Sequence, residues 1–512
     1  MLINTRFSIA LFVILAMPAT TRAQKVVPRD GVVKKYHRNG QVSARKTFKN
    51  GKLNGPHESY FKTGQLSSRG TYKDGKREGA FEKYHKNGQL KSKEAFKAGK
   101  KHGPFVRYFK NGDLSQKGAL KDGYKDGVWE LYHYNGELRS RESYKDGKSH
   151  GTFEKYFKDG RLQSKRTFKN SKKEGVFEEY HTNGQLMKRE TFKGGNKEGV
   201  FERYYDNGQL WRKFFFENGK IEGPFNEYHK NGKVSAKKTY ENGKPEGPVV
   251  AYYENGQLLE KTTYENGKRI GLSETYFKDG TLKRKEVFKN GERDGPLEVN
   301  YENGQPKIRG TFKDGKKEGA FEAHHENGNL YKKEVFKNGK HDGPFVVYYS
   351  NGRLEKKGAF KDGQQEGPFV GYHVNGQVGH KSAFKDGKQD GPFVTYYENG
   401  QLHHKGTYKN GNKEGPWEMY YENGQLKKKT TFKDDKGDGV FEIYYENGQL
   451  DSKYARTNGV KEGPIERYYE NGKLKEKGTF KSGKKDGIFE MYGEDGELQE
   501  KRMFKDGKRQ NQ

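Results

Sequence analysis

The chain has no cysteine, which excludes disulfide bonds, thiolate metal sites and a cysteine nucleophile. Hydrophobic residues make up only 29% of its 512 residues, too few for the thick cores of several globular domains. Beyond residue 23 there is no apolar run near the roughly 20 residues that a membrane-spanning helix needs. These absences disfavour a conventional globular enzyme and a helical membrane protein.

Glycine, by contrast, is abundant and recurs with a fixed period of 24 residues. Three series hold this period: Gly31 to Gly487, Gly40 to Gly496, and Gly51 to Gly507, the last broken only at Ser171 and Asp435. Twenty repeats of 24 residues, with no insertion or deletion, therefore span residues 31–510. A short fixed period predicts an array in which each unit packs on its neighbours. Tyrosines and phenylalanines at set places in each repeat argue against disorder.

The first 23 residues are a different kind of sequence. Arg6 precedes an apolar run over residues 7–17, and a stretch of small residues ends at Ala23. This pattern is typical of a secretory signal peptide cleaved after Ala23, and an uncleaved N-terminal anchor is the alternative. Residues 24–30 form a short lead-in to the array at 31–510. We therefore expect an exported chain that is secreted, periplasmic or held at the cell envelope.

Each repeat contains a turn signal between two stretches of β-forming residues, as at Asn87-Gly88. Asn-Gly favours a two-residue type I′ hairpin, because both of its residues tolerate a positive φ. Folding the chain about this pair places Glu82 opposite Lys93. The position of Lys93 is Lys or Arg in all 20 repeats and that of Glu82 is Glu in 13, so opposite charges favour this register.

This register predicts two different faces. The packing face would carry the stripes that begin with Phe81, His85, Leu90 and Phe96. The opposite, polar face would carry Glu82, Gln89 and Lys93, together with a row of tyrosines in which Tyr84 lies opposite Lys91. We expect binding residues on the polar face, and the candidates are Tyr84, Lys93, Tyr108, Lys117, Tyr396, Lys405, Tyr420 and Lys429.

The second glycine turn, at Ala98-Gly99, gives a different expectation. A two-residue hairpin here would place Lys97 opposite Lys100, and opposed like charges are unfavourable. We therefore expect a wider loop that leads into the next repeat. The predicted fold is all-β: an elongated, single-layer array of antiparallel hairpins, with two short strands in each of the 20 repeats.

Three segments carry a family resemblance: YFKNGDLSQKGALKDGYKDG at 108–127, YYENGQLHHKGTYKNGNKEG at 396–415 and YYENGQLKKKTTFKDDKGDG at 420–439. They resemble the MORN-repeat variant typical of bacterial YwqK-family antitoxins, and the resemblance covers residues 31–510. It implies stacked β-hairpins and non-enzymatic work, namely scaffolding, lipid-surface association or neutralisation of a toxin. Choline- and glucan-binding cell-wall repeats are a looser match, because they rely on tryptophan cages and this chain has three tryptophans.

The usual catalytic and metal-binding patterns do not stand out from the repeat. Seven of the 15 histidines, among them His85, take the place of Tyr or Phe in an aromatic stripe. His403 and His404 are adjacent and should point to opposite faces of a strand. Residues 434–439 are rich in Asp but lack the ligand pattern of a calcium loop. We therefore expect no enzymatic activity, no metal and no cofactor.

The net charge of +32 is the strongest functional hint after the repeat. Basic residues at the positions of Lys93 and Lys97 would line a cationic surface that attracts anionic lipids or polymers. Nucleic acid is less favoured, because 69 acidic residues interleave with the 101 basic ones. The sequence predicts an exported, non-enzymatic, protein-binding scaffold at the cell envelope or outside the cell, acting by multivalent contact. The alternatives are an antitoxin or immunity protein for a partner toxin, and electrostatic adhesion to anionic lipid or polymer.

Overall fold

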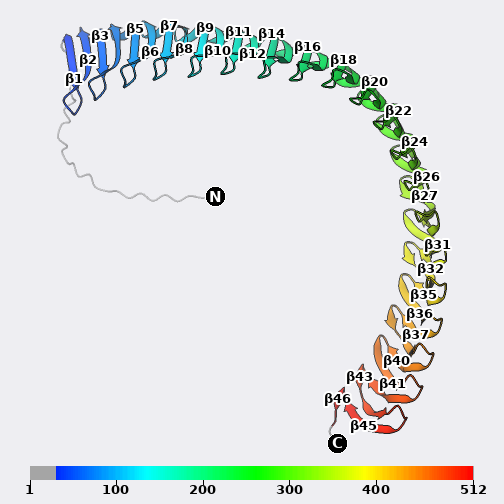
Figure 1. The fold of residues 1–512 in the computed structure, drawn as a ribbon. Helices are drawn as coiled ribbons and strands as arrows, with labels where there is room; N and C mark the ends of the chain where they lie inside the picture. Colours follow the sequence, from blue (N-terminus) through cyan, green and yellow to red (C-terminus); the bar gives the residue numbers. More distant parts are fainter. Residues whose placement is uncertain (1–29, 511–512) are drawn as a thin grey trace, which may run out of the picture. The chain divides into compact units, whose positions relative to one another are not determined.

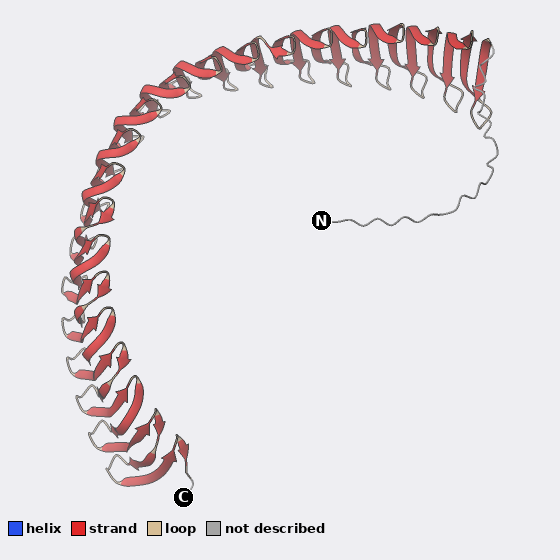
Figure 2. Cartoon of the chain, turned by 180° about the vertical axis from the view of Figure 1, so that it is seen from behind, coloured by secondary structure: helices blue, strands red, loops and turns tan. Residues whose placement is uncertain are grey.

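The computed structural model describes residues 30–510, which form β-strands and the turns between them (Figure 2). The described residues contain no helix, and so none that is long and apolar enough to cross a membrane. The predicted signal peptide and the lead-in up to residue 29 lie outside the described residues.

The described part of the chain forms 46 strands, in an order that follows the repeats (Figure 1). The first strand of each repeat ends at the tyrosine row: β1 (Gly31–Tyr36), β3 (Lys52–Tyr60), β5 (Lys76–Tyr84), β7 (Lys100–Tyr108), β9 (Tyr124–Tyr132), β11 (Lys148–Tyr156), β14 (Gly175–Tyr180), β16 (Asn196–Tyr204), β18 (Lys220–Tyr228), β20 (Lys244–Tyr252), β22 (Lys268–Tyr276), β24 (Glu292–Asn300), β26 (Lys316–His324), β29 (Gly343–Tyr348), β31 (Gln364–Tyr372), β34 (Gly391–Tyr396), β36 (Asn412–Tyr420), β39 (Gly439–Tyr444), β41 (Val460–Tyr468) and β44 (Gly487–Tyr492).

The second strand of each repeat has eight residues: β2 (Val42–Lys49), β4 (Leu66–Lys73), β6 (Leu90–Lys97), β8 (Leu114–Lys121), β10 (Leu138–Lys145), β12 (Leu162–Lys169), β15 (Leu186–Lys193), β17 (Leu210–Glu217), β19 (Val234–Glu241), β21 (Leu258–Glu265), β23 (Leu282–Lys289), β25 (Pro306–Lys313), β27 (Leu330–Lys337), β30 (Leu354–Lys361), β32 (Val378–Lys385), β35 (Leu402–Lys409), β37 (Leu426–Lys433), β40 (Leu450–Thr457), β42 (Leu474–Lys481) and β45 (Leu498–Lys505). Six two-residue strands complete the set: β13 (Lys172–Lys173), β28 (Lys340–His341), β33 (Lys388–Gln389), β38 (Lys436–Gly437), β43 (Lys484–Lys485) and β46 (Lys508–Arg509).

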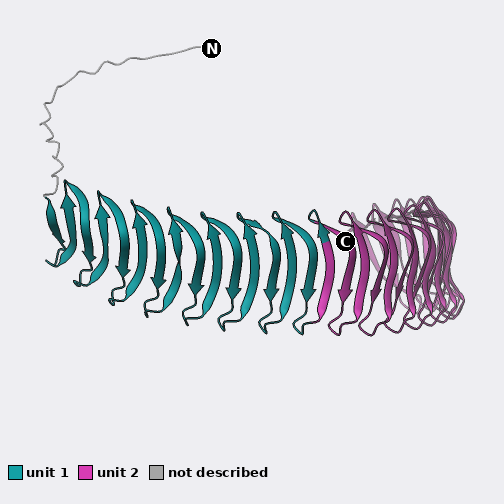
Figure 3. Ribbon diagram, turned by 90° about the horizontal axis from the view of Figure 1, so that it is seen from above, with its two compact units in different colours: residues 1–208, 216–219 teal, residues 209–215, 220–512 magenta. Residues whose placement is uncertain are grey.

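The chain divides into two compact units, unit 1 with residues 1–208 and 216–219, and unit 2 with residues 209–215 and 220–512 (Figure 3). Within each unit, strands that follow one another in the chain pair antiparallel, as β5 with β6 and β6 with β7 in unit 1. The strands of unit 1 lie side by side in one layer (Figure 3). The prediction of an all-β array of antiparallel hairpin repeats is confirmed.

The predicted register holds at the centre of the hairpin and shifts at its end. Glu82 lies opposite Lys93 as expected, but Tyr84 lies opposite Leu90, and a β-bulge at this end takes up one residue. The backbone N–H of Gly88 donates to the carbonyl of His85 at 3.0 Å, and Gly88 has a φ of 83°. Asn87 has no positive φ, so this is a three-residue loop with a glycine bulge and not the predicted type I′ turn. The bulge also places Leu90 on the polar face beside Tyr84, and not on the packing face.

The tight type I′ hairpin lies at the other glycine turn, where a wide loop was predicted. Ala98 and Gly99 have φ values of 51° and 86°, and Lys97 lies directly opposite Lys100. The prediction was wrong because it gave too much weight to repulsion between two exposed lysines, which costs only a few tenths of a kcal/mol. The preference of Asn-Gly and Asp-Gly for two positive φ angles is larger and decides the turn.

Aromatic rings on the packing face form the core of the array. In unit 1 the ring centroids of Phe81 and Phe96 are 5.0 Å apart, and only 9% and 6% of these residues is exposed. The guanidinium of Arg77 lies 5.1 Å from each ring. Residues 30–510 form no second layer over this face, so each ring is buried by its neighbours and by the basic side chain above it. We call this surface the aromatic face.

Side chains at the three-residue loops join each repeat to the next. Asn87 donates to the carbonyl of Lys110 at 2.8 Å and accepts from the N–H of Gln89 at 3.3 Å. The imidazole of His85 bonds to the carbonyl of Tyr108 at 3.3 Å, and tyrosines in the same position make the equivalent bond elsewhere, as Tyr349 does. Six of the seven histidines in this position make this bond between repeats, so their interpretation as substitutes for Tyr agrees with the structure. The exception is His133, whose Nε2 has no hydrogen-bond partner among the described residues.

Candidate functional site

The polar face is built around the glutamate in the first strand of the repeat. In β5 the carboxylate of Glu82 accepts a hydrogen bond from the hydroxyl of Tyr84 at 2.7 Å. It also pairs with Arg69 Nε of the preceding hairpin at 2.6 Å and with Lys93 Nζ of its own hairpin at 3.1 Å. Alternation along the strand puts Glu82 and Tyr84 on one side, and register brings the two bases beside them. One carboxylate thus binds three partners from three strands.

These contacts lower the pKa of the carboxyl group. The pKa of Glu82 falls to about 2, chiefly because the hydroxyl of Tyr84 donates to the charged form, while burial acts in the opposite direction. Bonds from Arg69 and Lys93 add to the lowering. The pKa of Tyr84 is raised, first by burial and then by its bond to Glu82. The carboxylate is therefore ionised and engaged at any ordinary pH, and it is not a free acid or base.

The same contact recurs across unit 1 and forms a charge ladder, the line of alternating acids and bases on the polar face. Each member lies opposite the next in the order Lys117, Glu130, Arg141, Glu154, Lys165, Glu178, Arg189 and Glu202. Glu130 is 2.7 Å from Lys117 and 3.0 Å from Arg141. Glu154 pairs with Arg141 at 3.5 Å and Glu178 with Arg189 at 3.1 Å, whereas Lys165 lies opposite both acids without an ion pair to either within 4.0 Å. Acids alternate with bases along this part of the face, so it does not present an uninterrupted row of cations.

The candidate residues from the sequence all lie on the polar face, but their surroundings differ. Tyr84, Lys93 and Lys117 are engaged with the glutamates just described, and Lys405 and Tyr420 with Glu418. Lys429 lies opposite Glu418 and Glu442. Tyr108 and Tyr396 lie in repeats where valine replaces the glutamate, at Val106 and Val394. The structure therefore separates the candidates into paired and unpaired positions.

A family model described as MORN repeat variant matches seventeen segments that together cover well over half of the chain: residues 29–50, 53–74, 77–98, 125–146, 149–170, 173–193, 197–218, 221–242, 245–266, 269–290, 293–314, 317–338, 389–410, 413–434, 437–454, 461–482 and 485–506. The chain belongs to the MORN repeat variant family. Residues 99–124 and 339–388 lie between matched segments, although the period continues through both.

Other comparisons add little to the family. No curated protein matches the chain. Among solved structures, crystal structures of TcdB2-TccC3-Cdc42 and TcdB2-TccC3 are each 12% identical, with TM-scores of 0.13 and 0.14. The Photorhabdus luminescens Tc holotoxin pore has a TM-score of 0.13 at 12% identity. These matches cover 90%, 90% and 91% of this chain but only 29%, 28% and 27% of the other chains. At such TM-scores the likeness carries no argument.

The charge ladder of the MORN repeats has its longest interruption in unit 2. Valine replaces glutamate in three successive repeats, at Val346, Val370 and Val394, while the lysine of every hairpin is kept. The order of opposed residues is Lys333, Val346, Lys357, Val370, Lys381, Val394 and Lys405. The two outer lysines pair outward, Lys333 with Glu322 at 2.9 Å and Lys405 with Glu418 at 2.6 Å. Within residues 30–510, Lys357 and Lys381 have no ion-pair partner within 4.0 Å.

The three tyrosines beside these valines also lack the partner that tyrosines have elsewhere. The hydroxyls of Tyr348, Tyr372 and Tyr396 make no hydrogen bond to any described residue, because the carboxylate two positions earlier is missing. We call the three valines, the three tyrosines, Lys357 and Lys381 the valine patch. Both lysines are exposed and the valines are half-buried.

A second cationic surface lies at the tight turns. Lys97 and Lys100 are exposed and directly opposed, and the same pairing recurs as Lys73 with Lys76 and Lys337 with Lys340. The sequence predicted basic surface at both the Lys93 and the Lys97 positions. Glutamates neutralise much of the basic surface at the Lys93 position, whereas the basic surface at the Lys97 position remains at the tight turns.

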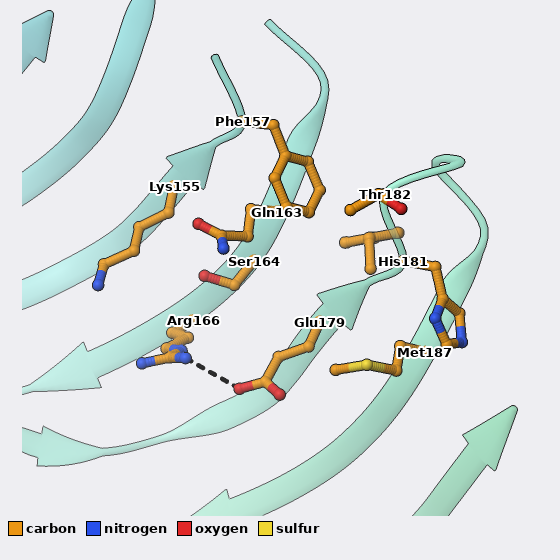
Figure 4. A pocket seen from close by; sticks show the side chains of 10 residues that line it. Lys155, Phe157, Gln163, Ser164, Arg166, Glu179, His181, Thr182 and Met187 are labelled. Carbon is orange, nitrogen blue, oxygen red and sulfur yellow. Dashed lines mark hydrogen bonds and ion pairs between the residues drawn. The ribbon is translucent and has the colours of Figure 1, made fainter. Parts of the chain in front are cut away.

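An open hollow of about 460 Å³ lies on the aromatic face of unit 1 (Figure 4). Figure 4 shows Arg166 and Glu179 pointing toward each other, and their side chains are 2.9 Å apart. Glu179 also pairs with Lys188 at 3.3 Å, so its carboxylate is already held by two bases. Arg166, Glu179 and Lys188 therefore form a local ion-pair cluster beside the hollow.

The sequence predicted that the adjacent histidines point to opposite faces of a strand, and this prediction was wrong. The ring centroids of His403 and His404 are 3.8 Å apart, and His403 stacks 4.2 Å from Tyr397. His403 lies at the bulge between Leu402 and His404, which turns two successive side chains to the same side. Burial, together with the charge of His403, lowers the pKa of His404 to about 4. No group of three metal-binding side chains occurs among the described residues.

The valine patch was not predicted from the sequence. Glutamate occupies this position in 13 repeats, so a run of three valines is a visible departure in the sequence alone. It becomes meaningful only with the register, because the register shows that Val370 lies opposite both Lys357 and Lys381. The number of repeats with glutamate does not by itself reveal which lysines lose their partners.

Proposed function

We propose that this MORN-repeat chain is a non-enzymatic, protein-binding scaffold. The observation that carries the proposal is the charge ladder, which neutralises much of the polar face and leaves a few places with free polar and cationic groups. A surface of this kind suits recognition at particular repeats, while the regular repeats provide a rigid support. Carboxylates of this face such as Glu82 and Glu130 are engaged in ion pairs, which supports a role in binding and not in catalysis.

We further propose that the chain acts outside the cytoplasm, at the cell envelope or beyond it. Support comes from the basic and apolar start of the sequence, residues 6–23, which has the outline of an export signal. The antitoxin or immunity role is the narrower form of this proposal, in which the protein partner is a toxin. It draws its support from the resemblance of segments such as 420–439 to antitoxin repeats.

Electrostatic adhesion to anionic lipid or polymer is a second candidate function. It is favoured by the opposed lysines at the tight turns, such as Lys97 and Lys100, which repeat along each unit. Adhesion of this kind is screened by salt, whereas a packed protein interface keeps much of its affinity.

Affinity capture separates the two functions. Residues 24–512 would be immobilised, exposed to lysate and culture medium of the source organism, and washed first at low and then at high salt. The scaffold proposal predicts a discrete protein that survives the high-salt wash. Release of all protein by salt, with lipid or polyanion alone in the eluate, would contradict the scaffold and support adhesion.

A further inference from the structure

The valine patch differs from the rest of the charge ladder in what it lacks. In regular repeats a carboxylate lies between two bases and accepts a hydrogen bond from a tyrosine hydroxyl. Glu130 does so with Lys117, Arg141 and Tyr132. In the valine patch the bases and the tyrosines remain and the carboxylates are absent. Two cations and three hydroxyl donors therefore surround an apolar strip, with no acceptor among the described residues to satisfy them.

We propose that the valine patch docks an extended acidic segment of a partner protein. Carboxylates of that segment occupy the places that glutamate fills in other repeats, where they accept from Lys357, Lys381 and the tyrosine hydroxyls. Apolar side chains of the segment lie on Val346, Val370 and Val394. This inference rests on the proposed scaffold function and names the chemistry of one partner.

The spacing of the patch fits an extended peptide that crosses the strands. Lys357 and Lys381 are separated by one intervening strand, so they lie two strand spacings apart, or about 9.6 Å. A polyproline II segment has three residues per turn and rises about 9.3 Å in that turn. Every third side chain of such a segment therefore points to the same side with nearly the spacing of the lysines. A carboxylate at every third residue matches the patch without bending the peptide.

The chemistry of the patch favours an acidic peptide over a phosphate polymer. Only two free lysines are present, and a half-buried valine separates them. Valines add affinity for a partner that has apolar side chains, and they add nothing for a phosphate backbone. The opposed lysines of the tight turns, such as Lys337 and Lys340, are the better site for a polyanion. Charge complementarity together with the apolar strip identifies the protein segment.

One substitution removes the proposed site without introducing a foreign residue. Val370 lies opposite both Lys357 and Lys381, so Val370→Glu supplies an internal carboxylate to both lysines. Glutamate occupies this position in 13 repeats, so the variant is compatible with the fold. The matched control is Val106→Glu in unit 1, where the neighbouring lysines already pair with Glu82 at 3.1 Å and Glu130 at 2.7 Å. Both variants add the same charge at the same repeat position.

The probe is a fluorescent peptide with four Glu-Pro-Val triplets, and its neutral counterpart has Gln in place of Glu. Fluorescence anisotropy would be measured with the full chain. We expect the Glu peptide to bind, and the Gln peptide, Val370→Glu and the double variant Lys357→Ala/Lys381→Ala each to weaken binding about tenfold or more. We expect Val106→Glu to leave the affinity within about twofold of the unchanged chain.

Three results would overturn the inference. The first is no binding of the Glu peptide, and the second is equal binding by Val370→Glu and the unchanged chain. The third is binding of an oligothymidylate or of phosphatidylglycerol vesicles that Val370→Glu abolishes, which would assign the patch to a nucleic acid or a membrane. If affinity capture yields a salt-resistant protein that Val370→Glu still retains, the scaffold function stands and the docking site alone is wrong.

Discussion

At the scale of single residues, the glutamate of the first strand decides what the polar face can do. Glu82 binds a tyrosine and two bases, whereas Val370 in the same position leaves two bases without a partner. The pairing of Glu82 with Lys93 could be predicted from alternation and charge. The bond from Tyr84 could not, because it runs along one strand and depends on how far the phenol reaches.

The engaged carboxyls predict a loss of stability in acid. The pKa of Glu82, Glu130 and Glu490 is lowered from 4.5 to about 2 in the folded chain. Between these values the unfolded chain binds more protons, so the stabilisation is complete above pH 4.5 and is lost as the pH falls toward 2. Thermal unfolding followed by circular dichroism should show this decline, with a smaller decline in the triple Glu→Gln variant. A midpoint that is constant across this range would contradict the bonding of these carboxyls.

Glycines on the aromatic face predict another residue-scale effect. A Cβ added at Gly406 would overlap the indole ring of Trp417, which is only 6% exposed. Gly406→Ala should therefore destabilise the local structure by about 1–3 kcal/mol through overpacking. The control is Ser382→Ala, one repeat earlier at the same position, where a side chain already fits and the cost should stay below about 1 kcal/mol. Hydrogen exchange of β35 to β37 measures the difference, and equal protection in both variants would contradict the close packing.

At the scale of the hairpin, the two glycine turns have different structures because their residues meet different backbone demands. The side-chain amide of Asn87 accepts a hydrogen bond within its own loop and donates one to the loop of the next repeat. This position therefore needs an amide side chain, and its backbone has no positive φ. Ala98 and Gly99 both need a positive φ, which is the condition for a two-residue hairpin. In most repeats Asn or Asp precedes the glycine at both turns, so the dipeptide alone does not distinguish a hairpin turn from a bulged loop.

The tight turns predict a stabilising substitution. Ala98 is held at a φ of 51°, in a region that alanine occupies with difficulty, whereas most repeats have Asn or Asp there. Ala98→Asn should stabilise the turn by up to about 1 kcal/mol, and Asn338→Ala should destabilise its turn by a similar amount. The N–H of both residues bonds to a glutamate, at 2.7 and 2.8 Å, so the two sites are well matched. Hydrogen exchange at the two turns should move in opposite directions, and movement in the same direction would refute the explanation.

At the scale of the whole molecule, the repeat made the fold class predictable, whereas the irregular features of the hairpins became visible only in the structure. The period, the alternation and the cross-strand charges were enough to predict antiparallel hairpins and the pair of Glu82 with Lys93. The bulge was not predictable from these signals, because it shifts only the last pair of the hairpin. For the same reason the side chains near it, Leu90 and His403, were assigned to the wrong face.

The distribution of charge matters more for function than the net charge of +32. Some basic residues lie over aromatic rings, as Arg77 does, and others pair with glutamate, as Lys93 does. The lysines at the tight turns and in the valine patch remain available. A protein partner at the valine patch would use two of these cations, whereas a polyanion along the turns would use many.

The salt dependence of partner binding tests this distinction most directly. The affinity of the captured protein for residues 24–512 would be measured by calorimetry from about 0.05 to 0.5 M salt, where screening of exposed charges becomes nearly complete. A packed site with two charged contacts predicts a fall of about tenfold or less over this range. A fall of about a thousandfold or more would show that many turn lysines act together, and that adhesion, not protein recognition, is the function of the repeat array.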